Sequence, residues 1–168
     1  VYNWIDIEST NNLVSGLGDD NIIGSFPIED FNYYWYPVAS LSIGSNGFIS
    51  FSNPQNIASP FPIIPTASGA NDFIAPLLSD LTFTGINNPG RCYIDNHNMD
   101  STIISYVDVP FWQLANPQYT GANTFQIILC HIDSTISFQY KSMSGITNGN
   151  DITIGIESVA GSIGLQHS

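Results

Sequence analysis

Apolar and polar residues alternate along most of this chain, most clearly from Leu41 to Phe51. Ile43 and Ile49 alternate with serines, and the two runs meet at Ser45-Asn46-Gly47. Asn-Gly between alternating runs predicts a tight hairpin in which both central residues take positive φ. A period of two places the apolar side chains on a buried face and the serines on the other face. The centre of the protein is therefore expected to be a β-sheet.

The rest of the chain consists of short apolar runs separated by turns rich in Gly, Asp, Asn and Ser. These runs predict strands at Val1–Ile7, Ile22–Ile28, Arg91–Asp95, Ile103–Val109, Thr124–Ile132, Ile136–Tyr140, Ile152–Ser158 and Ser162–Gln166. The segment Asn53–Gly69 is rich in proline, so we expect it to cross the surface in extended form. No stretch has a sustained helical apolar face. The pattern predicts an all-β fold, an antiparallel and jelly-roll-like β-sandwich with little or no helix.

Length and charge narrow the class of protein. The 168 residues suit a single domain over residues 1–168. Fourteen acidic residues stand against Arg91 and Lys141, which gives a net charge of −12. Nucleic acid and anionic membrane surfaces are poor partners for such a chain, because both are bound by clustered Lys and Arg. No apolar run is long enough to span a membrane, so we expect no membrane insertion.

The remaining composition favours an extracellular or cell-surface location. Lysine is scarce, whereas Asn, Ser, Thr and Gly are abundant. The chain begins at Val1, which is typical of a mature or excised piece of a longer protein. Cys92 and Cys130 both lie in strand-like runs, so they are either bridged or simply small buried residues.

A series of short motifs in this order resembles a known family. It resembles a β-sandwich module of secreted and cell-surface bacterial proteins, found beside peptidase, adhesin-type and sorting domains, and is distantly similar to the nidogen-type extracellular domain. The motifs are Tyr2-Asn3-Trp4-Ile5-Asp6-Ile7, Gly18-Asp19-Asp20, Ser45-Asn46-Gly47-Phe48-Ile49-Ser50-Phe51, Ile74-Ala75-Pro76, Asp80-Leu81, Thr124-Phe125-Gln126-Ile127-Ile128-Leu129, Ile136-Ser137-Phe138-Gln139-Tyr140 and Ile154-Gly155-Ile156-Glu157. The resemblance implies an extracellular module without catalytic residues. The family often has an aromatic residue and a second acid where this chain has Leu78-Ser79, which argues against a metal site there.

Candidate catalytic residues are few. His131 and Asp133 share one face of a strand and Ser134 follows them, but solvated hairpin residues give the same pattern. His97 and His167 have no zinc-site spacing.

Two carboxylates are candidates for burial. Glu157 lies on an expected strand and Asp80 in a loop. Glycoside hydrolysis would need two such acids in one cleft, whereas a buried acid commonly accepts backbone hydrogen bonds at a strand end. We expect the second role for both, and no enzyme.

Calcium is the cofactor that the sequence best supports. Asp19, Asp20 and Asn21 place several oxygen ligands in one turn, and the net charge favours a cation. The same residues also form an ordinary turn.

Two groups of aromatic residues bear on ligand binding. The segment Tyr33–Tyr36 and the loop Phe111-Trp112, with Tyr119 beyond it, either offer flat faces for a glycan or surface protein, or cap the open end of the sandwich. Phe111, Trp112 and Tyr119 are the expected ligand-binding residues.

These observations predict a non-catalytic extracellular module of a larger bacterial surface or secreted protein. It would serve adhesion, binding or structural spacing, with the other domains of its parent protein as partners. The alternative is a carbohydrate-binding accessory module of a secreted hydrolase. A hydrolase itself would require His131 or Glu157 in a pocket beside a second titratable group.

Overall fold

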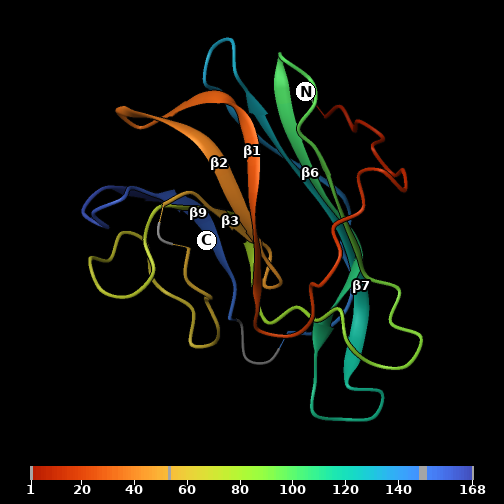
Figure 1. The fold of residues 1–168 in the computed structure, drawn as a ribbon. Coiled ribbons are helices and arrows are strands. Elements are labelled where there is room, and N and C mark those ends of the chain that lie inside the picture. Colours follow the sequence, from red (N-terminus) through yellow and green to blue (C-terminus); the bar gives the residue numbers. More distant parts are fainter. Residues whose placement is uncertain (1, 53, 148–150, 168) are drawn as a thin grey trace.

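The computed structural model describes residues 2–52, 54–147 and 151–167, which form two antiparallel sheets and no helix (Figure 1). One sheet has the strand order β1-β2-β3-β4-β9-β10 and the other has the order β5-β6-β7-β8. The strands of the first sheet are β1 (Ile22–Tyr33), β2 (Tyr36–Gly44), β3 (Phe48–Ser50), β4 (Phe73–Leu78), β9 (Thr153–Glu157) and β10 (Gly164–Gln166). Those of the second are β5 (Arg91–Asp95), β6 (Ser101–Trp112), β7 (Tyr119–Cys130) and β8 (Ile136–Ser142). The described residues contain no helix that is long and apolar enough to cross a membrane.

The main core lies between the two sheets. Alternate residues of each strand point inward, because successive side chains of a strand face opposite sides. The first sheet contributes Ile43, Ile49 and Ile74, and the second contributes Ile104 and Ile127. The predicted β-sandwich is confirmed.

Most of the expected strand pairs are also confirmed. The pairs β5–β6, β7–β8 and β9–β10 are antiparallel and lie close to the predicted ranges. The expected strand Ile22–Ile28 is longer in the structure and continues as β1 to Tyr33. The aromatic cluster that follows forms the end of the β1–β2 hairpin, where Tyr33 pairs with Tyr36.

The central hairpin forms where it was predicted, but its turn differs. Three residues connect β2 to β3, and the Gly47 N–H donates to the Gly44 carbonyl at 3.3 Å. Gly47 has a φ of 78°, whereas Asn46 is not among the residues with positive φ. The expectation of two central residues with positive φ was therefore wrong. Glycine is needed at position 47 because an added Cβ would collide with the Leu77 carbonyl.

The middle of the outer face of the first sheet, at β3 and β4, is buried as well, contrary to expectation. Ser42 and Ser50, predicted to face outward, are buried. The proline-rich segment covers them and forms a second apolar cluster with the sheet, made of Phe48, Ile57, Phe61, Ile64, Phe73, Ala75 and Leu78. Asn53 lies outside the described residues. The described part of this segment contains no strand, as predicted, but it packs on β3 and β4 and does not simply cross the surface.

The predicted first strand is wrong. Residues 2–8 form no ladder and lie against the second sheet, beside β6 and β7 in Figure 1. The Gln126 side chain on β7 takes the place of a neighbouring strand: its Oε1 accepts from the Ile5 N–H at 3.3 Å and its Nε2 donates to the Ile5 carbonyl at 2.7 Å. The Asn3 N–H likewise donates to Gln139 Oε1 at 3.0 Å. The alternating pattern here reflects a segment packed on a sheet face by side-chain amides.

Candidate functional site

Phe111, Trp112 and Tyr119 lie on paired strands and not in a loop. Trp112 is opposite Tyr119 at the ends of β6 and β7, and Phe111 is opposite Thr120. The Phe111 side chain is only 5% exposed and belongs to the main core. Trp112 and Tyr119 are half-buried, and the Tyr119 hydroxyl donates to the Ile86 carbonyl at 2.9 Å. Trp112 and Tyr119 are thus the partly exposed members of this trio, and ligand binding by it stays a prediction.

The turn with Asp19, Asp20 and Asn21 is held by its own hydrogen bonds. Asn21 Oδ1 accepts from the Gly18 N–H at 2.8 Å, so this oxygen points into the turn. Asp20 Oδ1 accepts from Asn46 Nδ2 at 2.8 Å. Asp19 forms a backbone bridge with Thr82. Of the three expected calcium ligands, the two carboxylates are better placed than Asn21 to offer oxygens to an ion.

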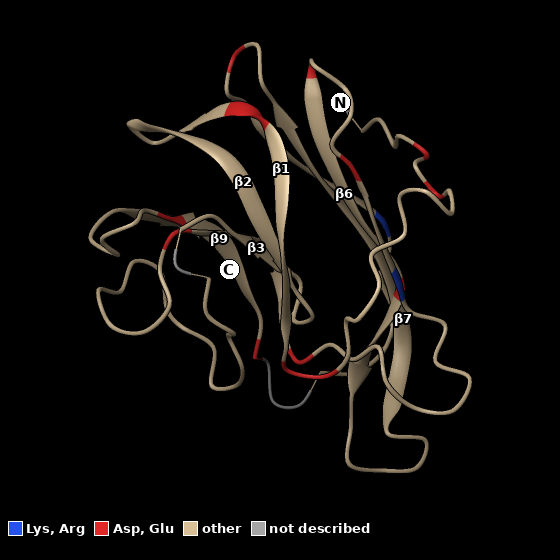
Figure 2. Cartoon of the chain, viewed as in Figure 1, with Lys and Arg blue, Asp and Glu red and all other residues tan. Residues whose placement is uncertain are grey.

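Asp80 shares its surroundings with these carboxylates. Burial, followed by the charges of Asp20, Asp19 and Asp151 in that order, raises the pKa of Asp80 to about 6. Figure 2 shows acidic positions from separate segments gathered at the lower end of the sandwich. Within the described ranges, no three His, Cys, Asp or Glu side chains lie close enough to hold a metal ion together. Calcium binding stays a prediction that depends on Asp19 and Asp20.

His131 has a structural role at the start of the β7–β8 turn. One ring nitrogen, Nε2, lies 3.0 Å from Thr102 Oγ1, and the other, Nδ1, lies 3.0 Å from the Met99 carbonyl. The ring therefore joins this turn both to the start of β6 and to the turn before it. Ser134 is not among the hydrogen-bond partners of His131, so the nucleophile–base contact of a triad is not formed.

Glu157 has the role expected of a buried acid at a strand end. Its carboxylate accepts from the Thr66 N–H, and the Asn71 amide, oriented to satisfy its neighbours, donates to Oε2 at 3.1 Å. Burial raises the pKa of Glu157, and the Thr66 hydrogen bond opposes that rise. The Tyr33 hydroxyl lies 2.8 Å from the Phe73 carbonyl and accepts from the Glu157 N–H at 3.1 Å. This network holds the proline-rich segment against β4 and β9.

Asp72 is a second buried carboxylate, which sequence reasoning missed. It is 1% exposed and has a φ of 64°. Its oxygens accept from the Tyr36 hydroxyl, the Ser52 hydroxyl and the Ser52 N–H, the last at 2.9 Å. Its position directly before an apolar run was the available signal, because Asp tolerates the left-handed backbone that ends a loop.

The β1–β2 hairpin divides the aromatic cluster between the core and solvent. Tyr33 is buried, and its ring packs against that of Phe51 in a tilted arrangement with the ring centroids 4.7 Å apart. Trp35 is 61% exposed at the hairpin end, where Tyr34 has a φ of 54°. The structure thus combines both roles expected of the cluster, a core cap and an outward aromatic face.

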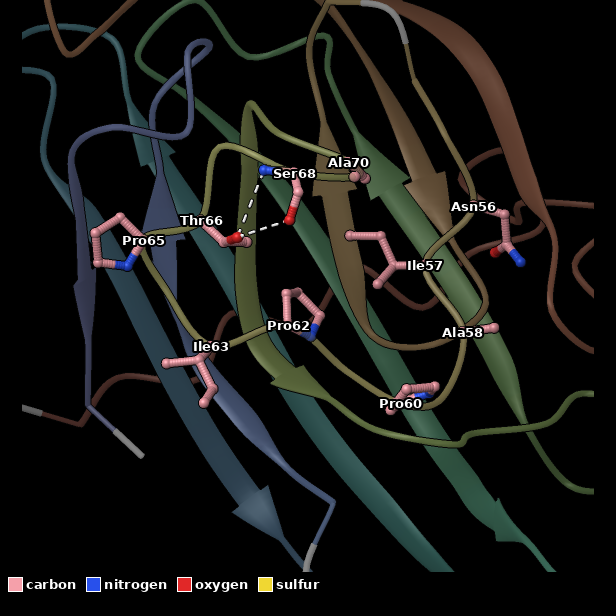
Figure 3. Close-up of a pocket in the computed structure, with 11 residues that line it drawn as sticks. Asn56, Ile57, Ala58, Pro60, Pro62, Ile63, Pro65, Thr66, Ser68 and Ala70 are labelled. Carbon is pink, nitrogen blue, oxygen red and sulfur yellow. Dashed lines mark hydrogen bonds between the residues drawn. The ribbon is translucent and has the colours of Figure 1, made fainter.

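The proline-rich segment encloses a hollow of about 520 Å³ (Figure 3). Its lining includes Pro60, Pro62 and Pro65, and its polar side chains are Asn56, Thr66 and Ser68. Thr66 Oγ1 lies 3.1 Å from Ser68 Oγ, so these two hydroxyls are paired with each other. No lining side chain has a carboxylate, imidazole or amine for acid–base chemistry.

Comparison with known families settles the relationship of the chain. Residues 1–168 match the family described as NIDO related. The chain belongs to this family. No curated protein and no solved structure is similar enough to count as a match. The similarity to the nidogen-type extracellular domain is therefore confirmed over the whole length of the NIDO-related chain.

The two cysteines of the NIDO-related domain are not bridged. Cys92 pairs with Tyr106 across β5 and β6, and Cys130 pairs with Ser101 at the other end of β6. Cys92 is buried, and burial raises the pKa of its thiol. Both thiols are therefore free, and Cys92 is protected from reaction.

An apolar seam also opens in the NIDO-related domain between the two sheets. It has a volume of about 330 Å³ and lies between β8 on one side and β9 and β10 on the other. Its apolar lining consists of Ile136, Phe138, Tyr140, Ile154, Ile156 and Leu165. β8 and β10 are the last strands of their sheets, so the sandwich is open along this side.

Proposed function

We propose that this NIDO-related domain is a non-catalytic extracellular module of a larger bacterial surface or secreted protein. It serves adhesion, binding or structural spacing. Its partners are the other domains of its parent protein and a surface protein or glycan. A net charge of −12 makes nucleic acid a poor partner.

One observation carries this proposal: the buried polar side chains bind the backbone of the domain's own loops. Asn46 donates to the Ile57 carbonyl at 2.8 Å, Gln126 binds Ile5, and Glu157 accepts from Thr66. Catalytic groups are instead commonly found beside each other in a cleft. Polar groups used in this way make a rigid scaffold whose exposed side chains are available for partners.

A carbohydrate-binding accessory module of a secreted hydrolase is the second candidate. The cross-strand pair of Trp112 and Tyr119 favours it, because both side chains are partly exposed on adjacent strands. Neighbouring aromatic faces on a rigid sheet suit the apolar faces of sugar rings.

Calcium is the proposed ion. Asp19 and Asp20 would supply the carboxylates, and the negative charges that, after burial, raise the pKa of Asp80 would favour a divalent cation.

Arrays of glycans and of extracellular proteins, probed with the wild-type domain and with Trp112→Ala, test these proposals. Binding to either array supports a binding module, and glycan binding lost in Trp112→Ala favours the accessory-module candidate. A parallel panel of chromogenic glycosides, esters and peptides tests for catalysis. Turnover that disappears in His131→Ala or Glu157→Gln would contradict the non-catalytic proposal.

A further inference from the structure

We propose that the end of the β1–β2 hairpin, together with the polar hollow beside it, binds a neutral sugar ring. This inference rests on the proposed function as a binding module and names a ligand class and a site for it. The site consists of the exposed indole of Trp35 and the hollow lined by Ser52, Gln55, Gly69, Asn71, Asp72 and Val159.

Trp35 is exposed, but neighbouring side chains hold its indole in place. The two residues Tyr34 and Trp35 close the hairpin, and the rings of Tyr34 and Tyr36 lie edge-on to the indole at 5.4 and 6.4 Å. The Tyr34 hydroxyl donates to the Ile156 carbonyl at 3.3 Å, and the Tyr36 hydroxyl donates to Asp72. Tyr34 also keeps a left-handed φ, which is uncommon for a bulky residue and is maintained only where its surroundings enforce it. An indole held in this way loses little freedom on binding.

Tyr36 connects the support of Trp35 to the polar hollow through its hydrogen bond to Asp72. Tyr36 contacts Trp35 on one side and binds Asp72 on the other, and Asp72 forms part of the hollow's lining. Asp72 also fixes Ser52 by accepting from its N–H at 2.9 Å. Asp72 is therefore a positioning residue between the support of Trp35 and the hollow.

The hollow can offer hydrogen bonds to a ligand. Gln55 is exposed, and its amide has no hydrogen-bond partner among the described residues. The volume of about 190 Å³ lies below the range of about 300–1,000 Å³ typical of pockets for drug-sized ligands. The hollow therefore suits one ring-sized group.

These features together match the chemistry of a pyranose. A sugar ring presents a C–H face that packs on an aromatic ring, and hydroxyls that bond to amide and hydroxyl side chains. The described lining of the hollow contains no Lys, Arg or His, and it includes the Asp72 carboxylate. Anionic sugars lack a counter-charge here, so the ligand is neutral.

A glycan array provides the test, with neutral hexose and N-acetylhexosamine oligosaccharides as probes and uronic-acid and sialylated glycans as the contrast set. The wild-type domain is expected to bind neutral glycans. Trp35→Ala is expected to weaken binding by about tenfold or more, as for other tryptophans at binding hot spots. Gln55→Ala is expected to weaken it by a smaller factor.

Tyr2→Ala is the matched control, because Tyr2 is also an exposed aromatic and lies on the N-terminal segment. It should bind as the wild type does. Circular dichroism and the melting midpoint should be unchanged in all three variants, since each side chain is exposed. Titration of the best neutral oligosaccharide, followed by tryptophan fluorescence, should show a shift in the wild type that Trp35→Ala lacks.

Three results would overturn the inference. Loss of glycan binding in Trp112→Ala with full binding in Trp35→Ala would assign glycans to β6 and β7 and leave the binding-module proposal intact. Preference for uronic or sialylated glycans would refute the neutral ligand. Binding to the protein array without glycan binding would refute a sugar site but again not the binding module, which fails only if neither array is bound or if turnover is found.

Discussion

Asn46 Nδ2 donates a hydrogen bond to the carbonyl oxygen of Ile57, 2.8 Å away. The same amide nitrogen donates to Asp20 at 2.8 Å, and Asn46 Oδ1 accepts from the Leu81 N–H at 3.2 Å. A residue recognised in the sequence as a turn former thus joins the turn of Asp20 and the loop of Leu81 to the proline-rich segment. Its side chain is fully buried, so these hydrogen bonds have no competition from water.

Asn46→Ala should lower the free energy of unfolding by roughly 2–4 kcal/mol, because it leaves buried donors and acceptors without partners. Urea unfolding followed by tryptophan fluorescence measures the change. Asn56→Ala is the control: Asn56 is exposed in the same segment and has no hydrogen bond among the described residues. A loss no larger than that of the control would show that the turn conformation matters and the side-chain contacts do not.

Tyr106→Phe should cost about 1–2 kcal/mol of unfolding free energy. The Tyr106 hydroxyl lies 2.8 Å from the Gly44 carbonyl and 3.0 Å from the Phe48 carbonyl, so it links the second sheet to the central hairpin. Tyr119→Phe removes a hydroxyl that binds a carbonyl at a half-buried site and should cost less than about 0.5 kcal/mol. Equal losses in chemical denaturation would contradict a special role for the link between the sheets.

The stability of the domain should fall as the pH rises from about 4 to above 6. The pKa of Asp80 is raised from 3.8 to about 6 by burial and by Asp20, Asp19 and Asp151, so the folded state holds this proton more tightly than the unfolded chain does. The stabilisation is complete below the unfolded pKa and is lost as the pH passes through the folded pKa. The pKa values of Asp19 and Glu157 are raised too, which adds to the same trend.

Asp80→Asn should flatten this profile and raise the melting midpoint at pH 7 by about 1–3 °C. Calorimetric scans between pH 4 and 7 measure both effects. Asp30→Asn removes the same charge from an exposed position on β1 and should leave the profile unchanged. A wild-type midpoint that does not change over this range would refute the raised pKa.

Calcium should raise the melting midpoint at neutral pH, because a cation between Asp19 and Asp20 would relieve the repulsion that Asp80 experiences. Scans in excess Ca²⁺ and in chelator measure the shift. In Asp20→Asn the shift should shrink, while Asp30→Asn should retain it. Equal melting midpoints in calcium and in chelator would refute the proposed calcium site.

Period-two burial predicted the two-sheet fold because side chains on a strand must alternate between faces. It failed for residues 2–7, the described part of the predicted strand Val1–Ile7, where an alternating segment is bound by Gln126 and Gln139 and not by a strand edge. It also misplaced Ser42 and Ser50, because a proline-rich segment distant in sequence covers their face. Both errors arise from long-range packing, which local periodicity does not contain.

The site was harder to predict than the fold. Sequence reasoning identified Glu157 as a buried acid but gave no sign that its partner would be Thr66. Tyr34, Trp35 and Tyr36 were visible as an aromatic run, but which ring faces solvent depends on the hairpin turn. The importance of Asp72 is visible only in the structure, where its carboxylate accepts hydrogen bonds from Tyr36 and Ser52.

The proline-rich segment covers the middle of the outer face of the first sheet, and the N-terminal segment lies against the second sheet. Segments outside the two sheets therefore pack on both broad sides of the sandwich. If the domain is a binding module as proposed, its loop ends and strand edges are the places where we expect neighbouring modules and ligands to bind. Sequence change can therefore alter recognition at these ends and edges without disturbing the packed interior.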